Sequence, residues 1–192
     1  MDYRECCKIF GIRDINSLPS RINEILFGDI EQRDAVFRAL LDSNHYDVSH
    51  DWFQGLYEAE LSEGKRKGQH FTPQSIYALI PELVGSSGKT VHEPTAGTGG
   101  LIIGDWWNWC KNRYPWEAAP SNRRYCCWEL SDRSVPILLL NIAVRGIMAE
   151  VFHGDVLENR IIQKYIVINR SNNFVGFSDV VKVDNNAKIK EL

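Results

Sequence analysis

One glycine-rich segment limits what this chain can fold into more than any other feature: residues 93–100 read Glu-Pro-Thr-Ala-Gly-Thr-Gly-Gly. The segment follows a run that we expect to form a short strand, residues 90–93, and it precedes a helical pattern over residues 101–109. Gly97 and Gly99 allow the backbone to turn sharply and to approach a ligand closely, and a side chain at either position would occupy the ligand's space. A loop between a strand and a helix is where open parallel sheets bind their ligands.

Three general interpretations of this loop compete. It can be a glycine turn without a ligand. It can be a dinucleotide loop of the form G-x-G-x-x-G, but Ile102 stands where the third glycine belongs, so the match is partial. A phosphate loop requires G-x-x-x-x-G-K-[ST]; residues 88–90 supply its last three positions, but Leu83 occupies the first glycine position and the segment precedes a strand. We therefore reject the phosphate loop and leave the first two interpretations open.

The chain divides at about residue 64 into two parts with different patterns. Before that point apolar residues recur at helical spacing, as in Ile22, Ile25 and Leu26, and no convincing strand pattern is found. After it, strand and helix patterns alternate. The expected strands cover residues 90–93, 125–128, 151–155 and 165–168, and the expected helices cover residues 72–83, 101–109 and 135–147. This alternation predicts an α/β domain over residues 65–192, with a mostly parallel sheet and helices on both faces, after a helical N-terminal region over residues 1–64.

Charge and cysteine content exclude several classes. The 192 residues carry a net charge of -3 and the pI is about 6.0, whereas a domain that coats nucleic acid usually has a pI above about 9. Basic residues at 65–67 and 123–124 still allow a local DNA contact. The five cysteines include no C-x-x-C pair, so neither a zinc knuckle nor a redox site is predicted. Without a signal segment or an apolar stretch of about 20 residues, we expect a cytoplasmic protein that does not bind membranes.

The acidic residue, proline and G-x-G of residues 93–99 resemble motif I of the N6-adenine DNA methyltransferases. Two further segments match in the expected order. Residues 68–73, Gly-Gln-His-Phe-Thr-Pro, resemble the segment before motif I, especially in modification (M) subunits of type I restriction-modification systems, and residues 154–157, Gly-Asp-Val-Leu, resemble the segment after the third strand. This resemblance covers about half of the chain. It implies a Rossmann-like, S-adenosylmethionine-dependent methyltransferase fold that lacks its C-terminal part.

The resemblance also implies a cofactor pocket for S-adenosylmethionine. In the family the glycine loop wraps the methionine half, and an acid at the position of Asp155 accepts a hydrogen bond from the adenine amine. Glu129, which ends the second strand, offers two acceptor oxygens for the ribose hydroxyls. The expected cofactor-binding residues are Phe71, Thr72, Pro73, Glu93, Pro94, Gly97, Gly99, Glu129, Asp155 and Val156. Purely structural alternatives are a helix N-cap at Thr72, a surface acid at Glu129 and a turn residue at Asp155.

The catalytic motif of the family is degenerate. The family places [DN]-P-P-[FYW] after its fourth strand to clamp the target amine and to stack on the flipped base. Here residues 169–172 read Asn-Arg-Ser-Asn, so the asparagine is present while both prolines and the aromatic residue are missing. Asn169 is the only candidate for a catalytic residue, and the sequence leaves enzymatic activity open.

Taken together, the resemblance implies a restriction-modification type, N6-adenine DNA methyltransferase-like protein that is truncated or catalytically impaired. Its implied partners are DNA and a specificity or other subunit. The alternative is a non-catalytic interaction or regulatory protein that keeps only the cofactor-binding fold. A nicotinamide-dependent oxidoreductase would not account for residues 68–73 or for Asp155. The five histidines show no metal-ligand spacing, so no metal is expected.

Overall fold

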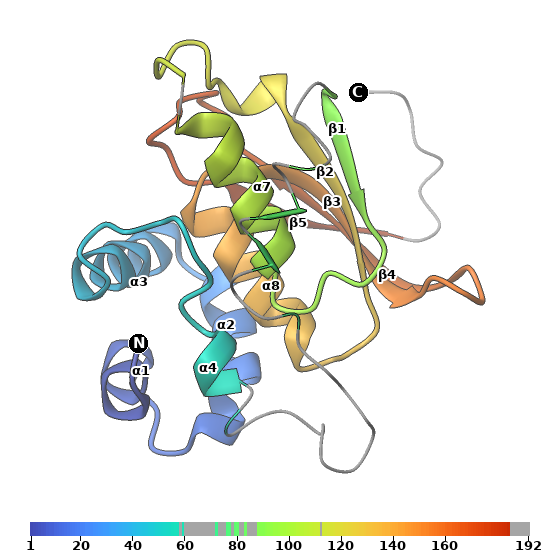
Figure 1. The fold of residues 1–192 in the computed structure, drawn as a ribbon. Coiled ribbons are helices and arrows are strands. Elements are labelled where there is room, and N and C mark those ends of the chain that lie inside the picture. The colour runs from blue at the N-terminus through green and yellow to red at the C-terminus, as the bar shows by residue number, and fades with distance from the viewer. Residues whose placement is uncertain are drawn as a thin grey trace.

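The computed structural model describes residues 1–57, 59, 72, 76–77, 79–80, 83, 88–111 and 113–184 (Figure 1). Helical elements in the N-terminal part are α1 (Tyr3–Phe10), η1 (Ile15–Ser17), α2 (Leu18–Leu26), α3 (Ile30–Ser43) and α4 (Gln54–Leu56). The remaining elements are β1 (Thr90–Glu93), α7 (Gly100–Cys110), η3 (Pro120–Asn122), β2 (Arg124–Glu129), α8 (Ser134–Val144), β3 (Met148–Asp155), β4 (Arg160–Ile168) and β5 (Asp179–Val183). Among the residues that the structure describes, no helix is long and apolar enough to cross a bilayer.

The helices of the N-terminal part begin and end at residues that cap them. Asp2 accepts a hydrogen bond from the backbone N–H of Glu5 at 2.8 Å, and Asp29 accepts one from Gln32 at 2.9 Å. Such side-chain acceptors satisfy donors that have no partner in the first turn. Gly11 ends α1 with φ +65°, a left-handed conformation that glycine adopts without strain.

The five strands form one sheet in the order β1-β2-β3-β4-β5. The first three strands are parallel, with Glu93 opposite Cys127 and Glu129 opposite His153. The last two are antiparallel to their neighbours. The α/β fold predicted from the sequence is therefore confirmed, with a sheet that is parallel on the side of the glycine loop and antiparallel beyond β3. Because parallel strands end at one edge, the loops that follow β1, β2 and β3 meet at the same end of the sheet.

The fourth strand is antiparallel to the third, and the reason is the length of the connection between them. Only residues 156–159 join β3 to β4, whereas a crossover to a parallel strand needs roughly a dozen residues or more. Asn159 adopts a left-handed φ of +49° within this turn. A Cβ on Gly154 would lie 2.2 Å from the carbonyl oxygen of Arg160, so glycine at this position lets the two strands approach each other.

Helices α7 and α8 lie on the same face of the sheet. The Tyr125 hydroxyl of β2 donates a hydrogen bond to Asp105 of α7 at 2.8 Å, and Gly99 at the start of α7 lies against Leu138 of α8. Both helices connect a strand to the next parallel strand in the same direction along the sheet. Right-handed crossovers in one direction place their helices on one face.

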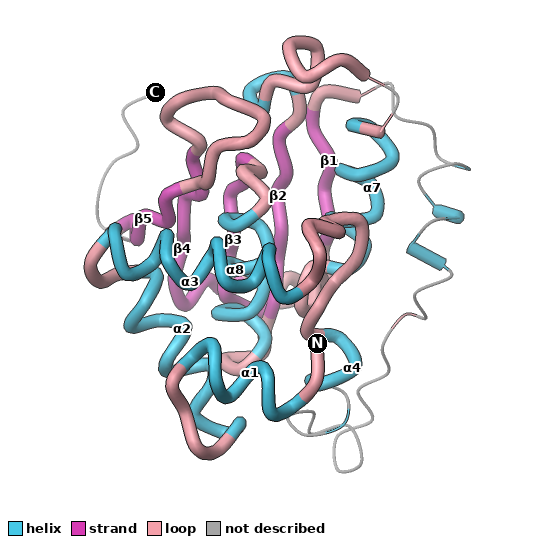
Figure 2. Tube along the Cα trace, turned by 90° about the vertical axis from the view of Figure 1, so that its left-hand side faces the viewer, coloured by secondary structure: helices cyan, strands magenta, loops and turns pink. Residues whose placement is uncertain are grey.

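The N-terminal helices pack outside α8, so that the helical part and the sheet share one core. Figure 2 shows α1, α2 and α3 in front of the strands. All eleven residues of α8 are buried, as expected for a helix that is apolar on every side. The apolar cluster runs from Phe10 and Ile22 through Leu138 to Val151. The expected boundary at residue 64 lies outside the described residues.

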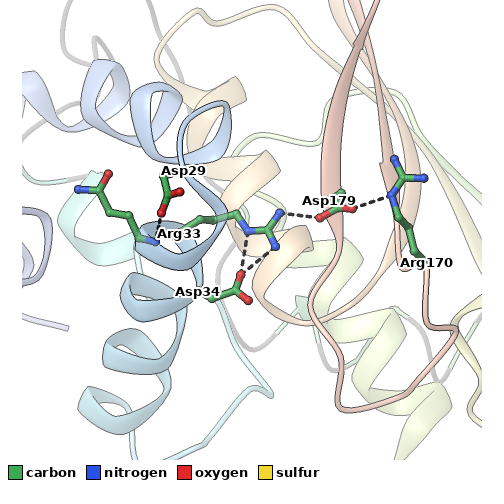
Figure 3. A network of polar contacts seen from close by, with 6 residues as sticks. Asp29, Arg33, Asp34, Arg170 and Asp179 are labelled. Carbon is green, nitrogen blue, oxygen red and sulfur yellow. Dashed lines mark hydrogen bonds and ion pairs between the residues drawn. The ribbon is translucent and has the colours of Figure 1, made fainter.

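A charged network joins α3 to the last strand (Figure 3). Arg33, which is 7% exposed, donates to Asp179 of β5 at 2.6 Å and to its neighbour Asp34 at 2.8 Å. The second oxygen of Asp179 accepts a hydrogen bond from Arg170 at 2.7 Å. Because a half-buried carboxylate lies between two guanidinium groups, the network fixes the helical region against the antiparallel edge of the sheet.

Candidate functional site

A cavity of about 390 Å³ lies at the carboxyl ends of the parallel strands. This volume is within the range of roughly 300–1,000 Å³ that is typical of small-molecule sites. Its lining residues come from the glycine loop, from the ends of β2 and β3, from the starts of α7 and α8 and from the segment before β1. They are Thr72, Tyr77, Pro94, Thr95, Ala96, Gly97, Thr98, Leu101, Glu129, Leu130, Ser134, Gly154, Asp155, Val156 and Leu157.

The two glycines of the loop differ in what they face. Both are left-handed, with φ +57° at Gly97 and +101° at Gly99. A Cβ on Gly97, which lines the cavity, would meet nothing within 4 Å, whereas a Cβ on Gly99 would lie 3.0 Å from the Leu138 side chain. Gly97 therefore borders the cavity, while Gly99 allows the close approach of α8; that either glycine makes room for a ligand stays a prediction.

Glu129 extends from the end of β2 to the glycine loop. One carboxylate oxygen accepts a hydrogen bond from the Gly97 N–H at 2.7 Å, and the other accepts one from the Ser131 N–H at 2.8 Å. A carboxylate offers about four acceptor positions, so two backbone donors leave capacity for a ligand's hydroxyl groups. The residue thus shapes the loop and lines the cavity at the same time.

Asp155 lies on the cavity wall where β3 ends. Its Oδ1 accepts hydrogen bonds from the N–H groups of Leu157 at 3.0 Å and Glu158 at 3.2 Å, so it caps the turn into β4. The next residue, Val156, also lines the cavity. The turn role that the sequence left open for Asp155 is therefore present, and it coexists with a position at the cavity.

The other expected cofactor residues fall into three groups. Thr72 and Pro94 line the cavity, and the carbonyl oxygen of Thr72 accepts a hydrogen bond from Gln54 at 3.0 Å. Glu93 is not among the lining residues; its carboxylate accepts a hydrogen bond from the Thr95 N–H at 3.1 Å within the loop. Phe71 and Pro73 lie outside the described residues.

The structure does not bring Asn169 to this cavity. Because β4 is antiparallel, its end lies beside the start of β3, roughly 20 Å from the carboxyl ends of the parallel strands. The Asn169 amide nitrogen donates to the carbonyl oxygens of Asn173 at 2.9 Å and Gly176 at 3.0 Å, and its oxygen accepts a hydrogen bond from Ser171 at 2.9 Å. The side chain is 3% exposed and holds the loop after β4 together.

Several lining residues were not foreseen from the sequence. Tyr77 packs on α7, since a Cβ on Gly100 would lie 2.3 Å from its ring and a Cβ on Gly104 would lie 2.5 Å from its carbonyl oxygen. Two small residues four positions apart on a helix are a signal for such close packing. Leu130 and Leu157 are 53% and 95% exposed beside the cavity. Each leucine follows an acidic strand end within two residues, so the same strand ends place both an acid and an apolar side chain at the cavity.

The charge of the cavity limits its ligands. Among the lining residues that the structure describes, Glu129 and Asp155 are acidic and none is basic. An anion such as a pyrophosphate would meet two carboxylates without a compensating side chain, whereas a cationic ligand would be attracted. Across the described ranges, no group of three or more histidine, cysteine or acidic side chains is placed to hold a metal ion.

Comparison with known proteins identifies relatives. The methylase subunit of the type I restriction enzyme HindI from Haemophilus influenzae is 45% identical over 53 residues, which make up 25% of this chain and 12% of that protein. The crystal structure of a modification subunit of a type I restriction enzyme from Vibrio vulnificus YJ016 matches with a TM-score of 0.47 and 16% identity, over 72% of this chain and 27% of that one. The chain thus spans only a small part of the length of these relatives.

The family itself is established by a longer match. The sequence model of the N-6 DNA methylases covers residues 48–184, which is more than half of the sequence. The match includes the glycine loop, both acidic strand ends and the last strand of the sheet. This chain belongs to the N-6 DNA methylase family.

Proposed function

We propose that the cavity binds S-adenosylmethionine and that the chain is the cofactor-binding part of a restriction-modification adenine methyltransferase. One observation carries the proposal: a cavity with Gly97 at one wall is bordered by the carboxylates of Glu129 and Asp155 and by no basic residue among its described lining. S-adenosylmethionine carries a sulfonium and an ammonium group against one carboxylate. Its excess positive charge matches this cavity, whereas the two phosphates of a nicotinamide dinucleotide would be repelled.

The residues suggest how the cofactor would be held. Glu129 would accept the ribose hydroxyls with the acceptor positions that Gly97 and Ser131 leave. Asp155 would accept a hydrogen bond from the adenine amine, and the exposed Leu130 and Leu157 would cover the faces of the adenine ring. Burying these leucines against the ring would stabilise the complex by removing apolar surface from water.

The bound cofactor would supply an electrophilic methyl group. In the family that the chain belongs to, the acceptor implied by the name is a DNA base, so we propose adenine N6 in DNA as the acceptor and a specificity or other subunit as a partner. The chain spans 12% and 27% of the length of the two relatives.

Calorimetric titration of S-adenosylmethionine tests the cofactor site. We expect micromolar affinity for the wild type and a loss of about 100-fold in Gly97→Trp, because the indole would fill the cavity (about 2.7 kcal/mol). The matched control is Gly11→Trp, since Gly11 is also left-handed and also open, but caps α1.

Asp155→Ala should weaken the binding of S-adenosylmethionine about tenfold, and Asp14→Ala, which removes a turn-capping carboxylate elsewhere, should not. A wild type that binds reduced nicotinamide dinucleotide and not S-adenosylmethionine would overturn the proposal.

A second function, a cofactor-binding protein that does not methylate, is favoured by the position of Asn169. The only residue that the sequence offered as an amine clamp is enclosed by its own loop at the other end of the sheet. A methyl-transfer assay with tritiated cofactor and adenine-containing DNA separates the two functions. Transfer by the chain alone would support the enzyme, and binding without transfer would support the non-catalytic protein.

A further inference from the structure

The glycine loop is held from behind by a residue of the N-terminal part, Asp51. Its carboxylate is 6% exposed and does not line the cavity. Oδ2 accepts a hydrogen bond from the Thr98 hydroxyl at 2.5 Å, and Oδ1 accepts hydrogen bonds from the Asn141 amide at 2.8 Å and the Phe53 N–H at 2.9 Å. Thr98 lies between the two left-handed glycines of the loop, whose backbones are less restricted than those of other residues.

Asn141 of α8 completes the contact with the loop. The same amide nitrogen that donates to Asp51 also donates to the carbonyl oxygen of Thr98 at 2.8 Å. Its oxygen accepts a hydrogen bond from Arg145 at 3.0 Å. The loop residue is therefore held by both its side chain and its main chain, from two elements that are distant in the sequence.

Arg145 balances the buried charge of this cluster. The guanidinium donates to the carbonyl oxygens of Val48 at 2.9 Å and His50 at 2.6 Å, and it lies 4.2 Å from the centre of the Trp52 ring. Burial lowers the pKa of Arg145 to about 10, so the side chain remains charged at neutral pH. Because a lone buried carboxylate is costly, the charge of Arg145 offsets part of the cost of burying Asp51.

We propose that Asp51 is a positioning residue for the cofactor loop, so that the helical N-terminal part sets the shape of the cavity. The proposal rests on the function proposed above for its cofactor side, but the ordering of the loop can be measured without a ligand. Glu129 holds Gly97 from the cavity side, while Asp51 holds Thr98 from the protein side. Without the second contact, a segment with two left-handed glycines would sample other conformations and bind the cofactor less tightly.

The test compares three variants of the full chain. Asp51→Ala removes all three accepted hydrogen bonds. Asp51→Asn keeps the shape and can still accept from Asn141 and Phe53, while its new amide can donate to the Thr98 hydroxyl. Leu40→Ala is the control for lost stability, because it opens a cavity in the core of the same helical part without touching the loop (about 2–5 kcal/mol).

Hydrogen exchange of a peptide that covers residues 95–100, measured without cofactor, is the first readout. We expect exchange about tenfold faster in Asp51→Ala, within about threefold of the wild type in Asp51→Asn, and unchanged in Leu40→Ala. Equal acceleration in Leu40→Ala would overturn the proposal, because the effect would then be general destabilisation. Unchanged exchange in Asp51→Ala would overturn it as well. If Asp51→Ala does not fold, Thr98→Val takes its place, because it removes the hydroxyl that donates to Asp51. Exchange faster than in Leu40→Ala then supports the proposal, and exchange no faster than in Leu40→Ala overturns it.

Calorimetric titration of S-adenosylmethionine into the same proteins is the second readout. We expect affinity about tenfold weaker in Asp51→Ala and near that of the wild type in Asp51→Asn. If the wild type does not bind the cofactor while loop exchange follows the expected order, the proposed function fails and the positioning role stands. If the wild type binds and Asp51→Ala matches it in both readouts, the positioning role fails and the proposed function stands.

Discussion

The two ends of the sheet use the same kinds of residue for opposite purposes. At the carboxyl ends of the parallel strands, Gly97 faces open space and Glu129 lines a cavity. At the other end, a Cβ on Gly146 would lie 2.2 Å from the carbonyl oxygen of Gly176, and Asn169 forms hydrogen bonds with its own loop through both ends of its amide. The cavity end keeps open space at Gly97 and acceptor capacity at Glu129, whereas at the other end Gly146 has no space for a side chain and the Asn169 amide is paired within its own loop.

This difference shows how a residue that can bind a ligand is distinguished from a residue of the same type that only stabilises the fold. A buried polar side chain whose donors and acceptors are all paired within the chain stabilises the fold and offers a ligand nothing. A polar side chain with acceptor capacity beside a cavity can do both. Substitutions at the two ends should therefore have opposite effects, with stability lost at one end and cofactor affinity lost at the other.

The largest effect on stability is expected from Gly146→Ala. The residue has φ +67°, and the new methyl group would overlap the Gly176 carbonyl oxygen, so the free energy of unfolding should fall by about 3 kcal/mol or more. Urea unfolding gives the value. Gly11→Ala is the matched control, because it has a similar φ of +65° and open space, and it should cost only about 1 kcal/mol. Equal losses in both variants would remove the steric difference on which the comparison depends.

Asn169→Ala should cause the next largest loss of stability, lowering the free energy of unfolding by about 2–3 kcal/mol. The change removes a buried side chain and leaves the carbonyl oxygens of Asn173 and Gly176 without this donor, while the affinity for S-adenosylmethionine should stay at the wild-type value. Asn122→Ala, which removes an exposed amide that donates to the Glu117 carbonyl oxygen, should cost about 0.5 kcal/mol. A stable Asn169→Ala protein with weakened cofactor binding would mean that Asn169 takes part in binding, and the contrast between the two ends of the sheet would be wrong.

Local features of the site could be predicted from the sequence, because each is encoded within a few residues. The strand before the glycine loop, the left-handed glycines and the acids that end the next two strands all follow from short patterns. The rule that parallel strands end at one edge then brings Gly97, Glu129 and Asp155 together. The predicted α/β fold is confirmed for the same reason.

The position of Asn169 could not be predicted, because it depends on the direction of one strand. If β4 were parallel, its end would lie at the cavity; because it is antiparallel, the residue lies a strand's length away. The turn before β4 offers only Asn159 as a left-handed residue and no Asn-Gly or Asp-Gly pair. The contact of Asp51 with Thr98 could not be predicted either, because it joins residues 47 positions apart and no periodic pattern in the sequence indicates it.

A smaller effect is expected when Asp179, near the far end, is protonated. Burial alone would raise the pKa of Asp179, but hydrogen bonds and charge from Arg33 and Arg170 lower it below the usual 3.8. An acid with a lowered pKa contributes stability above its unfolded pKa, and this contribution is lost as pH falls through the lower folded value. Asp179→Asn should therefore be less stable than the wild type by about 1 kcal/mol at pH 7.

The difference between Asp179→Asn and the wild type should shrink below about pH 4, which urea unfolding at several pH values would measure. The exposed Glu31, replaced by glutamine, is the control for the loss of a surface carboxylate. A difference that is constant with pH would mean that the carboxylate charge does not hold α3 to β5. The cofactor affinity of Asp179→Asn should not change, because the network lies away from the cavity.

The smallest effect is expected at the cavity end, from Leu157→Ala. The side chain is 95% exposed, so its truncation should change the free energy of unfolding by less than about 0.5 kcal/mol. If the leucine covers the adenine ring, S-adenosylmethionine should bind about threefold to tenfold more weakly, from the apolar surface that is no longer buried. Exposed Leu83, which does not line the cavity, provides the matched Leu→Ala control. Equal affinities in the two variants would leave Leu157 an ordinary surface residue, and the cavity end would then bind its ligand through Glu129, Asp155 and the glycine loop alone.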